Sequence, residues 1–328
     1  YDHNNMEVVL VDGASTDNTR ALMCEFALDN KDEFRRVVVL DNPKKTLPSG
    51  WNVALREYKG DAIIKVDAHA VIPEDFVSKN VRVLETGEYI CGGQRPNIID
   101  KPTPFKETLL LAESSMFGSS IASYRNNPGK TYVKSLFHAA YRREVFEKVG
   151  FFNEELVRTE DNEIHYRMRK AGYKLCFDPD IISYQYTRSS LKAMLKQKYA
   201  NGYWIGKTSK VCPKCLSIYH FVPFAFVSAI IASGSVIGAT GLAECIKKRH
   251  NHTLGKGISA LRKVTVVLTT VMWVLYALMA SGMAAVSAFK AEDKRNITNA
   301  CLPVLFLLLH LSYGIGTIAG LMDKSKRG

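Results

Sequence analysis

Three long stretches without a charged side chain constrain this sequence more than any other feature. Residues 219–243, 264–289 and 296–322 contain no Asp, Glu, Lys or Arg, and each exceeds the roughly 20 residues that cross a bilayer as a helix. Buried core helices are the alternative, but three such stretches in succession, with basic residues between them, favour membrane spans. We therefore predict a membrane region over residues 216–328 with about three hydrophobic helices.

The charge balance narrows the possible partners. The chain has 44 Lys and Arg against 32 Asp and Glu, a formal net charge of +12. Nucleic acid is excluded as the expected partner because Lys and Arg flank the apolar stretches and form no basic face interleaved with aromatic residues. The seven cysteines, an odd number, fit a reducing compartment. Cys212 and Cys215 form a single CxxC, which is short of the four ligands of a zinc site.

The first seventy residues predict a doubly wound α/β sheet. Nearly continuous apolar runs at residues 6–11, 36–40 and 62–66 read as buried parallel strands. Helical patterns lie between them, one after capping residues at 15–18 and one at residues 49–58. Strand, helix, strand, helix and strand in this order predict parallel strands with right-handed crossovers.

The rest of the polar part predicts helices at residues 76–85, 105–123, 141–150, 162–170 and 188–206. The last of these carries Leu191, Met194 and Leu195 on one face and lysines elsewhere, and Tyr203 and Trp204 follow. A basic amphipathic helix that ends in aromatics is typical of a bilayer surface, whereas a surface helix packed on the sheet is the alternative. The predicted boundaries are an α/β domain at 1–187, an interfacial segment at 188–215 and the membrane region.

Carboxylates follow the three predicted strands. Ligands of open α/β sheets bind beyond the carboxyl ends of the strands, and here those ends carry Asp12, Asp41 and Asp67. The sequence contains neither the G-x-G-x-x-G turn after the first strand nor a G-x-x-x-x-G-K-[ST] loop, so dinucleotide and P-loop sites lose their support. A nucleotide diphosphate would need a divalent cation beside these carboxylates, and Mg²⁺ or Mn²⁺ suits oxygen ligands.

Four motifs in order resemble those of the family 2 inverting GT-A glycosyltransferases. The sequence is most similar to the bacterial succinoglycan-type exopolysaccharide glycosyltransferases, which likewise carry Asp-Ala-His at the metal motif. The resemblance covers the whole polar part of the chain and implies a GT-A fold. The motifs are Val11-Asp12-Gly13-Ala14-Ser15-Thr16-Asp17-Asn18-Thr19, Val66-Asp67-Ala68-His69, Arg158-Thr159-Glu160-Asp161-Asn162-Glu163, and the segment from Gln197 to Trp204.

The resemblance implies a donor site for a nucleotide sugar. It places Asp12 at the uracil or ribose, with Asn42, Lys44 and Asn52 near the same nucleotide, although Asp12 could also be a turn or capping residue. Asp67 resembles the first ligand of the metal motif and contacts the donor diphosphate. His69 stands two residues on, on the same face of an extended backbone, and it either binds the metal, donates to a phosphate or is structural.

The same resemblance gives Asp161 the role of catalytic base toward the acceptor hydroxyl. Glu160 and Glu163 would shape the acceptor side, although capping of the following helix explains them about as well. Gln197 and Trp204 resemble a degenerate Gln-x-x-Arg-Trp segment that closes over donor and acceptor. The Arg is absent here and the spacing is longer, which argues against processive synthesis, and an interfacial anchor is the alternative role for Trp204.

Together with the apolar stretches, the resemblance implies a membrane-associated hexosyltransferase of exopolysaccharide or capsule synthesis. The donor would be a nucleotide diphosphate sugar, a UDP-hexose in particular, the acceptor a lipid-linked oligosaccharide, and the anomeric centre would be inverted. A polyprenyl phosphate that takes its first sugar is one alternative acceptor. A membrane-tethered binding protein without turnover is the alternative outside enzymes.

The topology is open at the level of sequence. A chain that begins Tyr1-Asp2-His3 shows no signal peptide, so we expect the α/β domain in the cytoplasm beside the inner membrane. Three spans then leave the basic loop at 245–263 outside, against the positive-inside bias. Alternatively, the stretch at 219–243 dips in and returns. Family members begin with a strand some thirty to forty residues before residue 6, so we also expect that an N-terminal strand is missing.

Overall fold

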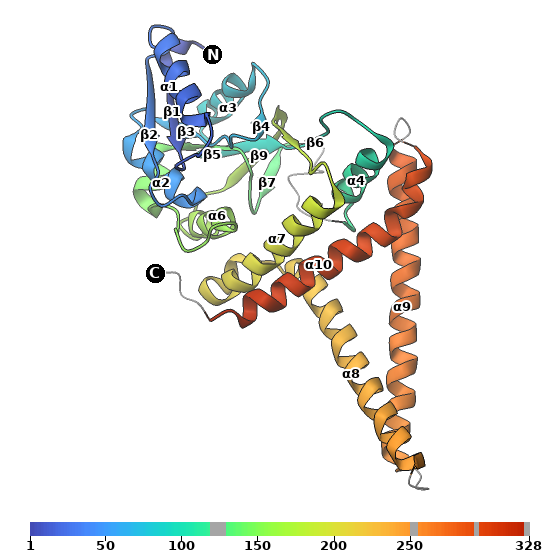
Figure 1. The fold of residues 1–328 in the computed structure, drawn as a ribbon. Helices are drawn as coiled ribbons and strands as arrows, with labels where there is room; N and C mark the ends of the chain where they lie inside the picture. The colour runs from blue at the N-terminus through green and yellow to red at the C-terminus, as the bar shows by residue number, and fades with distance from the viewer. Residues whose placement is uncertain (119–128, 250–254, 292–294, 325–328) are drawn as a thin grey trace.

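The computed structural model describes residues 1–118, 129–249, 255–291 and 295–324. An α/β domain comes first, two long helices lie beneath it, and a helical hairpin extends away from it (Figure 1). This arrangement confirms the predicted class, an α/β domain followed by apolar C-terminal helices. Short 3₁₀ helices also form at His3–Asn5, Pro213–Cys215, Ile218–Phe221 and Ile297–Cys301.

The first two predicted strands form a parallel pair. Strand β1 (Glu7–Asp12) pairs in register with β2 (Arg36–Asp41), so that Asp12 lies opposite Asp41 at the carboxyl end. Helix α1 (Thr19–Asp29) connects them, and α2 (Leu47–Glu57) follows. Apolar runs of β-branched residues with helical segments between them produce this unit, as the sequence predicts.

The main sheet is mixed and not wholly parallel. Its strand order is β3, β8, β5, β9 and β7. Strand β8 runs antiparallel to β3 and β5, β9 runs parallel to β5, and β7 is an antiparallel edge. Among the residues that the structure describes, β3 does not pair with β1 or β2. The strands are Ala62–Ile64, Ala139–Arg142, Ile90–Gln94, Leu175–Ile182 and Thr131–Val133.

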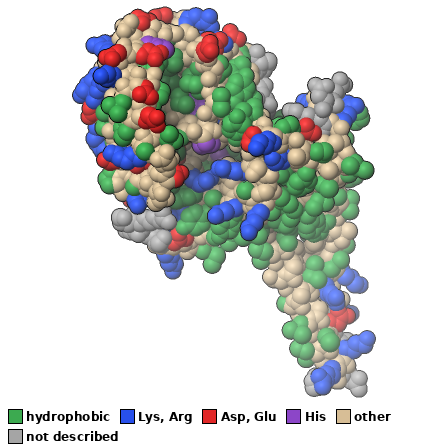
Figure 2. Space-filling model, turned by 45° about the horizontal axis from the view of Figure 1, so that its top comes forward, with side chains coloured by type: hydrophobic (Ala, Val, Ile, Leu, Met, Phe, Trp, Pro, Cys, Tyr) green, Lys and Arg blue, Asp and Glu red, His purple; other side chains and the backbone are tan. Residues whose placement is uncertain are grey.

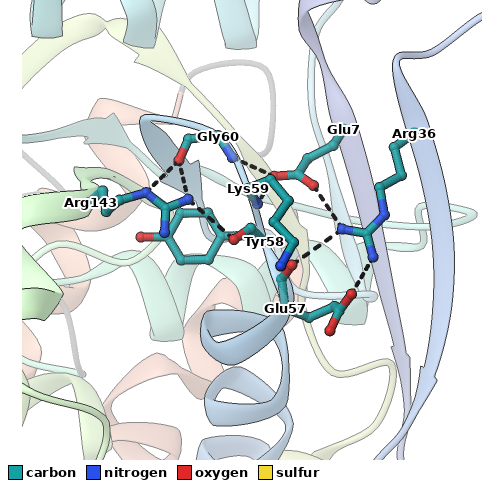
Figure 3. Close-up of polar contacts among 7 residues, drawn as sticks. All are labelled: Glu7, Arg36, Glu57, Tyr58, Lys59, Gly60 and Arg143. Carbon is teal, nitrogen blue, oxygen red and sulfur yellow. Dashed lines mark hydrogen bonds and ion pairs between the residues drawn. The ribbon is translucent and has the colours of Figure 1, made fainter.

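Side chains join the β1–β2 pair to the main sheet. Glu7 Oε1 accepts from Gly60 N at 2.7 Å, and Arg36 Nη1 donates to Glu57 O at 3.2 Å. On the other side, Arg143 Nη2 donates to Gly60 O at 2.7 Å. Figure 3 shows both arginines closing on the turn between α2 and β3. This turn fixes where β3 begins and therefore where the residues after β3 lie.

Three helices cover the main sheet. Helix α3 (Phe76–Glu85) has the predicted bounds, and α6 (Glu160–Lys170) begins two residues earlier than predicted. The predicted helix 141–150 is wrong at its start, because Tyr141 and Arg142 belong to β8 and only Arg143–Val149 is helical, as α5. Tyr141 pairs with Ile63 and Ile90 on the neighbouring strands, so it completes the sheet.

A small sheet lies at the end of the main one. It contains β4 (Ala70–Val71), β10 (Tyr184–Tyr186) and β6 (Asn97–Ile98) in that order. Helix α4 (Pro104–Ser114) follows β6 and is shorter than the predicted helix 105–123. Part of that prediction, residues 119–128, lies outside the described residues.

From residue 191 on, the long elements of the described chain are four helices. Helices α8 (Val222–Arg249) and α9 (Lys256–Lys290) form the hairpin of Figure 1, whereas α7 (Leu191–Val211) and α10 (Leu302–Met322) lie against each other. The three apolar segments, α8, α9 and α10, are each long and apolar enough to cross a membrane. The re-entrant alternative is wrong, because α8 is one unbroken helix about 42 Å long at 1.5 Å per residue.

Helices α7 and α10 run parallel and touch through glycines. Ser312 Oγ, in the middle of α10, donates to Leu195 O near the start of α7 at 2.8 Å, and Lys207 Nζ lies 3.3 Å from Asp323 Oδ2 near the ends of both helices. Glycines from both helices stand where a Cβ would overlap the opposite backbone, so the two helices approach closely. These glycines are Gly202, Gly206, Gly316 and Gly320.

Candidate functional site

A buried lysine and two carboxylates form the centre of the site. Lys65 directly follows β3, and its Nζ lies 2.8 Å from Asp161 Oδ1 and 4.0 Å from Glu160 Oε1. Asp161 and Glu160 belong to the first turn of α6, where the helix dipole favours negative charge. Because the side chain of Lys65 is 3% exposed, solvent screens these interactions little. The predicted catalytic carboxylate is therefore held by a cation at the end of a strand.

The three groups shift one another's pKa values. Burial raises the pKa of Glu160 to about 8, and the neighbouring charge of Asp161 adds to the effect. Burial also raises the pKa of Asp161, against the charge of Lys65. For Lys65, the charges of Asp161, Asp67 and Glu160 outweigh burial and raise the pKa. At neutral pH the lysine is charged and Glu160 is largely protonated. The side chain of Asp161 is 19% exposed against 4% for Glu160, so Asp161 is the carboxylate that a substrate can reach.

Asp67 lies beside this group and is held by a histidine. Its backbone N–H donates to His138 Nε2 at 3.3 Å, and His138 Nδ1 lies 2.8 Å from Ser183 Oγ. This geometry matches a neutral imidazole with its proton on Nδ1, and burial lowers the pKa of His138 accordingly. Burial opposes ionisation of Asp67, but the positive charge of Lys65 favours it, and the pKa of Asp67 is lowered to about 2. Asp67 is therefore ionised across the physiological range.

The chemistry of Asp67 fits one ligand of a divalent cation. Its Oδ1 is buried and has no hydrogen-bond partner within the described part of the chain, which is costly unless a ligand satisfies it. No group of three or more His, Cys, Asp or Glu side chains gathers for a metal in residues 1–118, 129–249, 255–291 and 295–324. Mg²⁺ commonly takes one or two carboxylates and completes its shell with water and substrate phosphates. The residues fit a cation that arrives with a diphosphate.

His69 lies at the rim of the site and not at its floor. Its side chain is exposed, and Nε2 contacts Gln185 Nε2 of β10. Burial of the ring and nearby arginines lower its pKa, against Asp67, so the imidazole is neutral at neutral pH. A neutral imidazole can ligate a metal or donate to a phosphate. Both of the predicted roles therefore stay predictions.

The predicted nucleotide residues separate into two groups. Asp12 is buried at the end of β1, and its Oδ1 accepts from Ser15 Oγ at 2.6 Å; this bond, against burial, lowers the pKa of Asp12. Asn42 is buried at the end of β2, where Oδ1 accepts from Ser49 Oγ and Nδ2 donates to Thr46 O, both at 2.8 Å. The turn role that the sequence allows for Asp12 is present, and a nucleotide role for either residue stays a prediction.

Asn52 and Lys44 meet at a loop after α5. Asn52 Nδ2 donates to Phe152 O and its Oδ1 accepts from Phe152 N, both at 2.9 Å. Lys44 Nζ is exposed and lies 2.6 Å from Glu154 Oε2. Asn52 therefore fixes the loop that carries Glu154, and Lys44 can reach a phosphate only by leaving this carboxylate.

The acceptor-side residues also differ in their surroundings. Glu163 forms a two-point contact with Arg167 of its own helix, at 2.7 and 2.8 Å, which supports the helical role over one in the site. Trp204 is buried in α7 and stacks edge-on with Tyr203. Gln197, also in α7, has a buried Oε1 without a hydrogen-bond partner among the described residues. Of the three, Gln197 offers an unsatisfied group to a ligand.

Sequence reasoning missed Lys65 and gave His138 no role. Lys65 interrupts the apolar run Ala62-Ile63-Ile64-Lys65-Val66, and a charge inside a buried strand is the signal that could have identified it. Its Nζ also lies 5.3 Å from the ring centre of Trp51 and 5.7 Å from that of Phe137. Arg142 ends β8 and Arg143 begins α5, and their guanidinium groups donate to the backbone carbonyls of Leu84, Glu88, Tyr58 and Gly60.

Comparison with known proteins agrees with this geometry. Residues 1–150 match the family model described as glycosyl transferase family 2. The succinoglycan biosynthesis protein ExoA of Rhizobium meliloti is 30% identical over 203 residues, which span 60% of this chain and 59% of that protein. A dolichyl N-acetyl-alpha-D-glucosaminyl phosphate 3-beta-D-2,3-diacetamido-2,3-dideoxy-beta-D-glucuronosyltransferase of Methanococcus voltae is 25% identical over 71% of this chain and 72% of its own.

The solved structures are more distant. A crystal structure of S. aureus TarS 1–349 covers 62% of this chain and 57% of its own, with a TM-score of 0.40 and 16% identity. At this distance no activity follows from the likeness. The match of residues 1–150 to the family model confirms, for that part of the chain, the resemblance that the motifs predict.

Proposed function

Because residues 1–150 belong to glycosyl transferase family 2, we propose that the protein transfers a sugar from a nucleotide diphosphate sugar to a lipid-linked acceptor, with inversion. The observation that carries this proposal is the Asp161–Lys65 pair beside the ionised Asp67. The pair supplies a positioned base, and Asp67 supplies a carboxylate with an unsatisfied oxygen. Inverting transfer needs one base toward the acceptor and charge stabilisation of the leaving diphosphate.

In the proposed reaction Asp161 takes the proton of an acceptor hydroxyl. The hydroxyl oxygen attacks the anomeric carbon, and the bond from that carbon to the diphosphate oxygen breaks on the opposite face, with its electron pair leaving on the diphosphate. The raised pKa of Asp161 makes it a stronger base than an ordinary carboxylate. Lys65 orients Asp161 and opposes the rise of its pKa, and the largely neutral Glu160 adds little negative charge beside it.

Asp67 and His69 would hold a divalent cation on the donor diphosphate. When bound, Mg²⁺ or Mn²⁺ supplies charge stabilisation for the leaving diphosphate. His138 holds the backbone of Asp67 through the 3.3 Å hydrogen bond, and Ser183 holds His138. Asp12 and Asn42, at the carboxyl ends of β1 and β2, are proposed for the nucleotide.

The apolar helices support a membrane-borne acceptor. Helices α8 and α9 are long and apolar and expose most of their surface. If they span a bilayer, they would hold the site near its surface. The names of relatives refer to succinoglycan synthesis, to a dolichyl-linked acceptor and to O-antigen chains. We therefore propose a lipid-linked glycan as acceptor, a UDP-sugar as donor, and a cytoplasmic α/β domain at the inner membrane.

A panel of nucleotide sugars tests the proposal. Full-length protein in bacterial lipid, with Mg²⁺ or Mn²⁺, should release the nucleoside diphosphate with at least one donor. Asp161→Asn should lose this release, whereas Asp29→Asn, at an exposed position in α1, should retain it. Absence of release above the Asp161→Asn background with every donor would refute the enzymatic proposal.

A further inference from the structure

Three arginines lie in segments that follow or precede elements of the site. Arg95 follows β5, Arg188 follows β10 by two residues, and Arg158 precedes α6 by two residues. The small sheet brings the first two together, because Gln185 N donates to Pro96 O at 3.2 Å and Gln185 also contacts His69. Thr187, next to Arg188, donates from Oγ1 to Glu113 Oε2 at 2.7 Å, and Glu113 lies 3.2 Å from Lys198 Nζ of α7, so the segment that carries Arg188 borders α7.

The charges of these arginines act on one another. Burial and the neighbouring charge of Arg188 lower the pKa of Arg158. In the described residues, neither Arg158 nor Arg188 forms an ion pair with a carboxylate. Like charges held together cost free energy that a bound anion would recover.

The cluster lies between the catalytic carboxylate and the apolar helices. Arg158 is three residues before Asp161, and its Nη1 donates to Asn201 Oδ1 of α7 at 2.8 Å. Gln197, with its unsatisfied Oε1, is one helical turn before Asn201 and therefore faces the same side. Figure 2 shows a hollow with histidine inside it and Lys and Arg side chains between the hollow and an apolar surface.

We propose that Arg158 and Arg188 bind the phosphate or diphosphate group of a polyisoprenoid lipid that carries the acceptor. Guanidinium groups bind phosphate oxygens with paired, charge-assisted hydrogen bonds. Because Asp67 is proposed to hold the donor diphosphate through a cation, Arg158 and Arg188, on the side of α7, are available to bind the phosphate of the acceptor lipid. The site would hold the lipid headgroup where α7 and α10 meet the domain, with the first sugars toward Asp161. This inference rests on the proposed function and names its acceptor subsite.

Binding measured without turnover tests the subsite separately from the reaction. In an Asp161→Asn background, full-length protein in nanodiscs is titrated with farnesyl diphosphate, farnesyl phosphate and UDP. Arg188→Gln and Arg158→Gln should each weaken farnesyl diphosphate binding about tenfold, or 1.4 kcal/mol, and leave UDP binding unchanged. Arg158→Lys should recover part of the loss, and Arg82→Gln, exposed in α3, should change neither.

Two results would overturn the assignment. An equal loss of UDP binding would place the arginines at the donor diphosphate, and unchanged affinity for all three ligands would leave no phosphate site. Arg188 makes no side-chain hydrogen bond in the described residues, so its variant tests the site even if Arg158→Gln destabilises the contact with α7. If the wild-type protein binds farnesyl diphosphate through these arginines but transfers no sugar, the subsite stands and the proposed function fails.

A different observation concerns the membrane topology. The most apolar window of α10 is 39% buried within the protein, against 6% for α8 and 11% for α9. Helix α7 covers the second half of α10, from the Leu195–Ser312 contact to the Lys207–Asp323 pair, and the first half of α10 packs in one cluster with residues of α4 and α9. Helix α10 therefore cannot cross a bilayer unless α7 crosses beside it.

The composition and contacts of α7 oppose such a crossing. It carries five lysines, and each charge at the centre of a bilayer costs about 2.5–3.5 kcal/mol on insertion scales. It also holds the α/β domain through Arg158–Asn201 and through the buried pair of Lys198 and Glu113 at 3.2 Å. In Figure 1 the α7–α10 pair runs across the base of the hairpin rather than along it. The lysines are Lys192, Lys196, Lys198, Lys207 and Lys210.

We infer that only α8 and α9 cross the membrane and that α10 lies with α7 on the side of the α/β domain. Labelling with an impermeant maleimide tests this in intact and opened cells. Cys245, exposed at the far end of α8, is compared with Met322→Cys at the end of α10, each as the single cysteine. Two spans place the two positions on opposite sides of the membrane. Labelling of both from the same side would show that α10 crosses and would overturn the inference.

Discussion

Replacing Lys65 with methionine isolates the role of the buried cation. The substitution preserves most of the side-chain volume and removes the charge 2.8 Å from Asp161 and 4.0 Å from Glu160. An opposite charge at such a distance lowers the pKa of a carboxyl group by about 1–3 units. Without Lys65, burial and the charge of Asp67 still raise the pKa of Asp161, so this pKa should rise further and a larger fraction of the base should be protonated at a given pH.

The expected consequence is a displaced pH profile. Below its pKa an essential base loses about tenfold in rate per pH unit, so at a pH below the pKa of Asp161 in both proteins Lys65→Met should transfer sugar about 10 to 1,000-fold more slowly. The activity should recover as pH rises, with the acidic limb of kcat displaced upward by at least about one unit. Nucleotide release measured from pH 5.5 to 9.5 at saturating donor provides the profile.

Folding needs a separate control, because loss of one partner of a buried ion pair costs about 3–5 kcal/mol. Lys65→Arg retains the charge and should keep the acidic limb near that of the wild type even if its geometry lowers the rate. Thermal unfolding in detergent identifies variants that fail to fold. If folded Lys65→Met loses activity with its acidic limb unchanged, Lys65 does not tune Asp161 and the reasoning is wrong.

Four further variants probe the site and the fold. Glu160→Gln mimics the protonated acid and should retain most of the transfer rate, and a loss as large as that of Asp161→Asn would make Glu160 the base. Asp67→Asn should lower nucleotide release about a hundredfold or more, and excess Mn²⁺ should not restore it. Burial lowers the pKa of His165 to about 3 in the folded protein. Between that value and about pH 6.5 only the unfolded histidine binds a proton, so the free energy of unfolding should fall by up to about 1.4 kcal/mol for each unit by which the pH is lowered. His165→Gln should remove this slope in urea unfolding, and an unchanged slope would contradict the reasoning. Gly206→Ala should lower the melting temperature by overlap with the backbone of α10, whereas Gly234→Ala in α8, where a Cβ meets nothing within 4 Å, should not, and equal melting temperatures would argue against the α7–α10 contact.

Local patterns in the sequence predict the elements whose signal is local. The strands before Asp12 and Asp41, helix α3 and the three apolar helices follow from runs of apolar residues and from caps. The main sheet was not predictable in the same way, because β8 and β9 pair with strands that lie far away in the sequence. Tyr141 illustrates the reason. Its segment has a helical pattern, but pairing with Ile63 and Ile90 outweighs that pattern.

Hydropathy predicts that a helix is apolar but not what covers it. Helix α10 has the composition of a membrane span, and its register with α7 is carried by glycines that no hydropathy scale weights. The same glycines leave the backbones of Tyr199 and Tyr203 in contact with α10. Small residues four apart on two helices indicate close packing, but which two helices meet depends on the tertiary fold.

The two adjacent carboxylates of α6 show how the fold divides roles that the sequence leaves equal. Glu160 and Asp161 are neighbours in one motif, and a helix turns about 100° between them, so only one can face the open part of the site. One lysine charge is available to the pair, and it lies closer to Asp161. Two buried carboxylates with one cation keep one proton between them, and the more deeply buried Glu160 holds it. The position of Lys65 at the end of β3 therefore decides which carboxylate can accept a proton from the substrate.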